Sequence, residues 1–101
     1  MRSYKVFISG RVTGLPWEEA VKNFERGKKM LLQNTYDPVS PLDHVKEGAT
    51  PKEAMKICYD LLFPCDGILL LNDHKFSEGS NLEEKTARYC GLMIFYEDDL
   101  I

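Results

Sequence analysis

The sequence predicts an α/β fold with three layers: a small parallel sheet of about four strands, with helices on both faces. Short apolar runs alternate with amphipathic segments along the whole chain, in the order β-α-β-α-β-α-β. Two of the runs, GILLL at 67–71 and LMIFY at 92–96, are almost continuously apolar, as expected for strands that are covered on both faces. Right-handed crossovers through short connections then distribute the helices over both sides of the sheet.

The first half of the chain supplies two strands and one helix. Residues 4–9 (YKVFIS) form a β-rich run that ends at Gly10. A helix opens at Pro16, and its apolar residues recur at helical spacing: Trp17, Ala20, Val21, Phe24 and Leu31. Residues 36–41 (YDPVSP) predict a weaker strand, because its two prolines cannot donate to a sheet.

The second half supplies two helices and the two apolar strands. Thr50-Pro51-Lys52-Glu53 combines an N-cap, a first-turn proline and a reciprocal glutamate, which predicts a helix that ends at Pro64. Strand 67–71 leads into a polar turn at 77–80, and a third helix is expected after that turn. Strand 92–96 closes the fold, followed by an acidic tail at 97–99.

Length and composition limit the function classes. With 101 residues, 44% of them hydrophobic, the chain is expected to form a single domain over 1–101. A net charge of -3 gives no basic surface for a nucleic acid polymer, and no apolar run is long enough to cross a membrane. Three cysteines without a CxxC pair predict free thiols, a cytoplasmic location and no metal site. No cofactor motif is present, so no cofactor is expected.

Ser77, Gly79 and Glu83 are the strongest candidates for a site. The turn and the first amides of the following helix lie at the carboxyl edge of the sheet and favour an anion. Glu83 leans back toward the same crevice, and it shares a helical stripe with Ala87 and Cys90, which predicts that it faces the sheet. The alternative is a capping box, in which Glu83 reaches back only to the backbone of Ser80.

The loop from Gly10 to Gly14 also follows a strand and precedes a helix. It matches neither a dinucleotide fingerprint nor a P-loop, so its two glycines can equally be ordinary turn residues. Arg11 could pair with an anion, or it could be a solvated charge.

These segments together resemble one superfamily. The loop FISGRVTG at 7–14, the strand entry Cys65-Asp66 and the series Ser77, Gly79, Glu83, Ala87, Gly91 occur in its order and spacing. The chain is similar to the nucleoside 2-deoxyribosyltransferase-like proteins, and especially to a short branch of them. The resemblance implies a Rossmann-like, flavodoxin-type sheet and cleavage or transfer at the N-glycosidic bond of a (deoxy)nucleoside or nucleoside 5′-monophosphate.

The resemblance also implies roles for individual residues. Glu83 would be the nucleophile on the anomeric carbon of the sugar, and Asp60 is a weaker candidate for assisting it. The residues expected to bind the small-molecule substrate are Phe7, Gly10, Arg11, Gly14, Ser77 and Gly79. A homodimer or larger homo-oligomer is expected, because pockets in this superfamily are often completed across an interface.

Two departures from the family pattern leave a second function open. Phe7 stands where relatives often have a tyrosine, and Cys58 falls in the register of an expected aspartate, with Asp60 two residues away. The alternative to an enzyme is therefore a non-catalytic nucleotide- or anion-binding module that has lost its acid and base partners.

Overall fold

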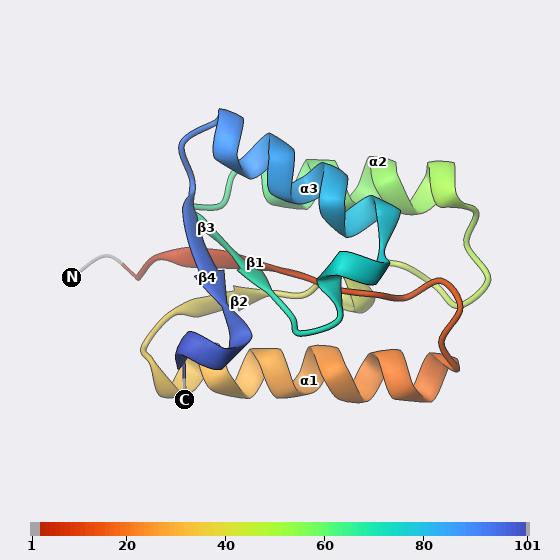
Figure 1. Ribbon diagram of the computed structural model, residues 1–101, viewed down its shortest axis with the longest axis horizontal. Coiled ribbons are helices and arrows are strands. Elements are labelled where there is room, and N and C mark those ends of the chain that lie inside the picture. Colours follow the sequence, from red (N-terminus) through yellow and green to blue (C-terminus); the bar gives the residue numbers. More distant parts are fainter. Residues whose placement is uncertain (1–2, 101) are drawn as a thin grey trace.

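The structure, a computed structural model that describes residues 3–100, contains a four-stranded parallel sheet in the order β2-β1-β3-β4. The strands are β1 (Lys5–Ser9), β2 (Asp37–Val39), β3 (Gly67–Leu70) and β4 (Met93–Tyr96). The α-helices are α1 (Trp17–Gln33), α2 (Pro51–Leu62) and α3 (Glu78–Tyr89). Helix α1 covers one face of the sheet, and α2 and α3 lie together over the other (Figure 1). The predicted three-layer α/β fold is confirmed. The expected domain limits, 1 and 101, lie outside the described residues.

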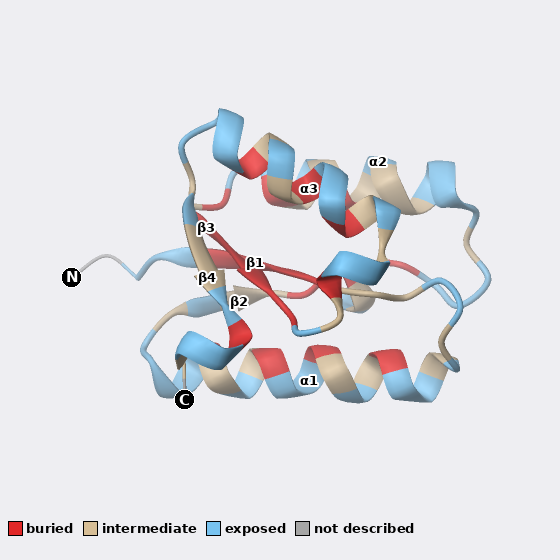
Figure 2. Cartoon of the chain, in the orientation of Figure 1, coloured by how far each residue is buried: buried red, intermediate tan, exposed pale blue. Residues whose placement is uncertain are grey.

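The strands divide the apolar residues into two cores. Along β1 the side chains alternate: Val6 and Ile8 pack with α1, whereas Phe7 packs with α2 and α3. Strand β3 is buried at every residue, as the run GILL predicts for a strand covered on both faces (Figure 2). The central strands β1 and β3 therefore end in a closely packed environment, and their carboxyl ends point to one edge of the sheet.

The edges of the sheet differ from the expectation. Strand β4 is an edge strand with partly exposed residues, so the prediction that it is covered on both faces is wrong. Its apolar run is continuous even though only one neighbour, β3, pairs with it. Strand β2 is shorter than predicted and gives way to a 3-10 helix at Pro41–Asp43. Proline at the first position of that helix has no amide to offer a strand.

Capping side chains set the starts of α2 and α3. Thr50 accepts a hydrogen bond from the Glu53 amide, and the Glu53 side chain bonds the Thr50 amide, so the predicted capping box of α2 is confirmed. Helix α3 begins earlier than expected, at Glu78, with Ser77 as its N-cap. Residues 78–80 of the predicted turn thus belong to the helix, and Ser77 caps it. No helix within residues 3–100 is long and apolar enough to cross a membrane.

The acidic segment after β4 folds back instead of leaving the domain as a tail. Glu97 lies in a 3-10 helix, is 4% exposed and forms a two-bond ion pair with Arg26 of α1. It also accepts a hydrogen bond of 2.9 Å from the amide of Asn72, beyond the end of β3. Burial alone would raise the pKa of Glu97, but the Arg26 guanidinium and the Asn72 amide hold it below its ordinary value. This carboxylate fastens the last segment to the α1 face.

We predict that Arg26→Met destabilises the protein by about 2 kcal/mol near neutral pH, because it leaves a buried carboxylate without its cation. The loss is expected to shrink as the pH falls through the lowered pKa of Glu97, since a protonated Glu97 no longer needs the cation. Urea unfolding at several pH values measures both effects.

Arg88→Met is the matched control for this prediction. Arg88 pairs with Glu84 on the exposed face of α3, at a distance of 3.0 Å. Its removal should lower the free energy of unfolding much less than the removal of Arg26 does, because a solvent-exposed ion pair contributes little to stability. If Arg26→Met and Arg88→Met lowered the free energy of unfolding equally, the buried Arg26–Glu97 pair would have no special role in stability.

Candidate active site

Glu83 lies on the inner face of α3 and is 5% exposed. Its carboxylate accepts a hydrogen bond of 2.7 Å from the hydroxyl of Ser9, the last residue of β1. Ser9 is 1% exposed and shares its face of the sheet with Phe7, two residues earlier. The structure therefore brings a buried carboxylate against the carboxyl end of a central strand.

Two further side chains complete a buried cluster around Glu83. The hydroxyl of Ser80, one turn earlier on α3, hydrogen-bonds to the hydroxyl of Ser9. The thiol of Cys58, which belongs to α2, hydrogen-bonds to Glu83. Because Ser9 donates to Glu83, its own oxygen is left to accept from Ser80, so the hydroxyl protons run from Ser80 to Ser9 to Glu83. The carboxylate is enclosed by donors from β1, α2 and α3.

Burial controls the proton affinity of this cluster. Removal from water raises the pKa of Glu83 to about 7, and the hydrogen bonds from Ser9 and Cys58 offset part of that shift. Burial and the neighbouring carboxylate raise the pKa of the Cys58 thiol. Near neutral pH, Glu83 is present both as a carboxylate and as a carboxylic acid, while Cys58 remains a neutral thiol.

The capping-box interpretation of Glu83 is wrong. Ser77 is the N-cap of α3 and accepts a hydrogen bond from the Ser80 amide, 3.1 Å away. Glu83 therefore lies in the second turn of the helix, too far along to reach a free amide of the first. Its hydrogen bonds go to other elements instead. Cys90, expected on the same inner stripe, is exposed at the end of the helix, whereas Ala87 is buried as predicted.

The Gly10–Gly14 loop lies at the same sheet edge and is tied down by Asp73. The carboxylate of Asp73 accepts a hydrogen bond of 3.0 Å from the Arg11 amide, which joins this loop to the segment after β3. Gly14 has a positive φ of 87°, and a guanidinium nitrogen of Arg11 lies 2.7 Å from the position that a Cβ atom of that residue would take. Arg11 thus folds over its own loop, where it donates to the carbonyl oxygen of Thr13.

Ser77 and Gly79 form the first turn of α3, next to α2. The hydroxyl oxygen of Ser77 is used as the helix cap, which leaves its proton available to donate to a ligand. A Cβ atom at Gly79 would come within 3.3 Å of the Met55 sulfur, so glycine allows α2 and α3 to approach closely here.

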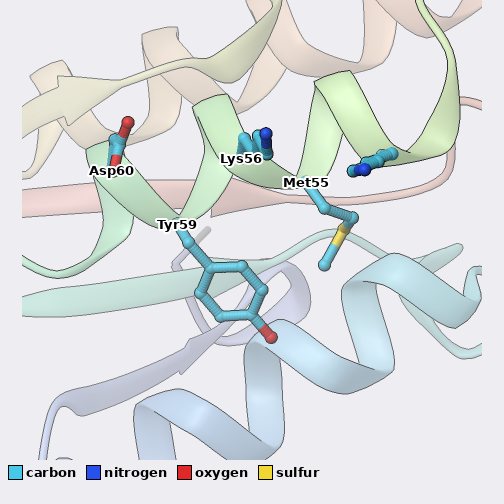
Figure 3. A pocket seen from close by; sticks show the side chains of 5 residues that line it. Met55, Lys56, Tyr59 and Asp60 are labelled. Atoms are coloured by element: carbon cyan, nitrogen blue, oxygen red, sulfur yellow. The ribbon is translucent and has the colours of Figure 1, made fainter.

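Phe7 and Asp60 take no part in the hydrogen bonds of this cluster. Phe7 is fully buried in the core that faces α2 and α3. Asp60 is exposed on α2 and lines an open depression of about 530 Å³ with Lys52, Met55, Lys56 and Tyr59. Met55 and Tyr59 point toward α3, whereas Asp60 points away from it (Figure 3). Cys58, and not Asp60, is the residue of α2 that contacts Glu83.

Ser9 and Ser80 were not predicted as site residues. Ser9 is a polar residue at the end of an otherwise apolar strand, and this position beside the Gly10–Gly14 loop is the signal that could have identified it. The capping-box spacing of Ser80 and Glu83 indicates only a capping role for Ser80. Within residues 3–100, no group of three His, Cys, Asp or Glu residues is arranged to hold a metal ion.

Comparison with known proteins identifies the family. Residues 4–96 match the model of a domain of unknown function, DUF4406. The chain belongs to this family. A search of curated proteins finds no match.

A solved structure shares the fold of this DUF4406 protein. It is a 2-desoxiribosyltransferase from Leishmania mexicana, with 18% sequence identity and a TM-score of 0.64. The similarity covers 92% of this chain but 63% of the Leishmania chain, so this protein matches less than two thirds of that enzyme's length. The predicted resemblance to 2-deoxyribosyltransferases is confirmed for the fold.

We predict that Glu83→Gln changes the pH dependence of stability. The folded-state pKa of Glu83, about 7, exceeds its ordinary value of 4.5, so folding takes up a proton between these values. The stability that the protonated carboxyl contributes is fully present below pH 4.5 and is lost as the pH rises through about 7. Glutamine cannot titrate, and the variant should gain roughly 2–3 kcal/mol over the wild type between about pH 5 and about pH 8.

Urea unfolding of both proteins at the two pH values tests this expectation. Glu84→Gln serves as the control, because Glu84 is half-buried and paired with Arg88. A difference between wild type and Glu83→Gln that stays constant with pH would show that Glu83 is not desolvated.

Proposed function

We propose that this protein cleaves or transfers at the N-glycosidic bond of a (deoxy)nucleoside or nucleoside 5′-monophosphate, with Glu83 as the nucleophile. The observation that carries the proposal is the buried Glu83 carboxylate, held by Ser9 and Cys58 at the carboxyl edge of the sheet. Ligands of open α/β sheets bind at this edge. The fold shared with a 2-desoxiribosyltransferase supports the proposal, and that enzyme's reaction is carried over only as part of it.

The proposed reaction uses the ionised form of Glu83. One carboxylate oxygen attacks the anomeric carbon as the bond to the base breaks, which gives a glycosyl ester on Glu83. Water or a second base then attacks the same carbon and releases the carboxylate. The hydrogen bonds from Ser9 and Cys58 fix the carboxylate in position before the attack. A pKa of about 7 keeps a large fraction of Glu83 ionised at neutral pH.

The remaining predicted residues are assigned to binding. The Gly10–Gly14 loop and the first turn of α3 offer backbone amides, and Ser77 offers a hydroxyl, to a sugar or its 5′-phosphate. Arg11 would pair with the phosphate if its guanidinium moved away from Gly14 and from the carbonyl oxygen of Thr13. Phe7 would support the site from the core, and Asp60 would assist only if the substrate extended over the surface of α2.

A second candidate function is a nucleotide- or anion-binding module without catalysis. Two residues favour it, because neither supplies an acid or base for catalysis. Phe7 carries no hydroxyl, and the group that α2 places beside Glu83 is the neutral thiol of Cys58. Binding of nucleotides without release of any base would support this candidate.

We predict that Glu83→Gln lowers base release at least about 1000-fold, because the amide cannot form the glycosyl ester. Release of free base from deoxynucleosides and their monophosphates, followed by chromatography, measures the effect. The wild-type rate should rise with pH through about 7, as Glu83 ionises beside Ser9 and Cys58.

Glu84→Gln is the control, because it removes the adjacent carboxylate of the same helix and should retain the wild-type rate. Unchanged base release by Glu83→Gln would falsify the role of Glu83.

We also propose a homodimer or larger homo-oligomer in the cytoplasm. Large apolar side chains on α3 and at the residue that follows α2 are strongly exposed: Leu82, Tyr89 and Phe63 at 50%, 94% and 60%. Light scattering is expected to give at least twice the monomer mass of 11.6 kDa. A mass equal to the monomer at micromolar concentration would contradict this expectation.

A further inference from the structure

Among residues 3–100, two glutamates are buried, Glu83 and Glu97, and they have opposite electrostatic surroundings. Glu97 is neutralised by the guanidinium of Arg26. The partners of Glu83 are the hydroxyl of Ser9 and the thiol of Cys58, with the hydroxyl of Ser80 behind Ser9, and all three are neutral donors. Among residues 3–100, no lysine, arginine or histidine forms an ion pair with Glu83. Its ionised form is therefore a buried negative charge without a counter-charge.

A buried, uncompensated carboxylate complements a positively charged ligand. Hydrogen bonds from neutral groups offset only part of the cost of removing a carboxylate from water, as the raised pKa of Glu83 shows. A cation placed beside it would favour the ionised form and would itself be attracted. The part of the chain that the structure describes supplies no such cation beside Glu83, so the ligand is the natural source of one.

The chemistry of the leaving group also favours a positively charged ligand. When an N-glycosidic bond breaks, the electron pair goes to the ring nitrogen, and a neutral base leaves as an anion unless an acid protonates it. The groups that contact Glu83 are poor acids: a serine hydroxyl, and a thiol whose pKa burial and Glu83 itself raise. A ring nitrogen that already carries a positive charge leaves as a neutral base and needs no proton.

We propose that the substrate of this site is a nucleoside or nucleotide whose base is a positively charged aromatic ring joined to the sugar through its charged nitrogen, as in a pyridinium nucleoside. This inference rests on the proposed function and narrows its substrate class. Glu83 donates an electron pair to the anomeric carbon, the carbon–nitrogen bond breaks, and its pair neutralises the ring nitrogen. Water then attacks the anomeric carbon, the bond to Glu83 breaks to restore the carboxylate, and one proton passes to solvent.

The first test compares charged and neutral leaving groups on the wild-type protein. The charged probes are nicotinamide riboside, its 2′-deoxy analogue and their 5′-monophosphates, and the neutral probes are adenosine, cytidine, their 2′-deoxy analogues and their 5′-monophosphates. We expect kcat/KM for base release to be at least about 100-fold higher for the pyridinium compounds, the range that an absent general acid accounts for.

The second test measures binding, so it does not require that the protein cleave its uncharged compound, dihydronicotinamide riboside. Dihydronicotinamide riboside has nearly the shape of nicotinamide riboside but no charge, so the pair isolates the effect of the cation. Wild-type protein should bind the charged compound roughly tenfold more tightly, and Glu83→Gln should bind the two equally. Ser77→Ala, which keeps Glu83, is expected to retain the preference for the charged compound even if both compounds bind more weakly.

The outcomes separate this inference from the proposed function. Release of neutral bases at rates equal to or above those of the pyridinium compounds overturns the inference and leaves N-glycosidic cleavage standing. A preference for the charged compound that persists in Glu83→Gln overturns the inference as well, since the cation would then be recognised elsewhere. No base release from any compound overturns the proposed function and the inference together.

Discussion

The packing of α2 and α3 against one face of the sheet is the constraint on which the site depends. It buries the end of β1 and the inner face of α3, and it thereby removes the Glu83 carboxylate from water. Desolvation, rather than a neighbouring charge, is what raises the pKa of this group. The same packing brings Cys58 from α2 and Ser9 from β1 within hydrogen-bonding reach. A shift of α2 away from α3 would therefore alter the geometry and the proton affinity of the site together.

Glu83 and Glu97 show how one residue type acquires two roles from its surroundings. Glu97 meets Arg26 and the amide of Asn72, and its pKa is lowered, so its charge helps to hold the end of the chain against α1. Within the described residues, Glu83 meets only neutral donors, and its charge opposes folding above its pKa. A carboxylate that costs stability at neutral pH is the kind of group that functional sites retain. The proposed nucleophile and its preference for a cationic base both follow from this contrast.

Much of the fold could be predicted because the strong signals were local. The capping box at Thr50 and Glu53, the continuous apolar run of β3 and the helical spacing in α1 each identify an element without tertiary information. The predictions were wrong where packing against other elements, or competition between two possible capping residues, decides the structure. The run of β4 is apolar, yet the strand lies at an edge, and Ser80 precedes Glu83 at capping-box spacing, yet Ser77 takes the cap. The residue pattern of a segment predicts its secondary structure, but it does not predict which of its faces other elements will cover.

The sequence by itself determined the order and type of the helices and strands and the sheet edge at which polar residues gather, and it indicated Glu83 as a candidate without excluding a capping role. These follow from periodicity, turn residues and the direction of helical side chains, which act over a few residues. Only the tertiary structure decided that Ser9, Ser80 and Cys58 surround Glu83 and that Asp60 lies on the outer surface of α2. The reason is physical: Ser9 and Glu83 are 74 positions apart in the chain, and their hydrogen bond exists only after three elements have packed and excluded water between them.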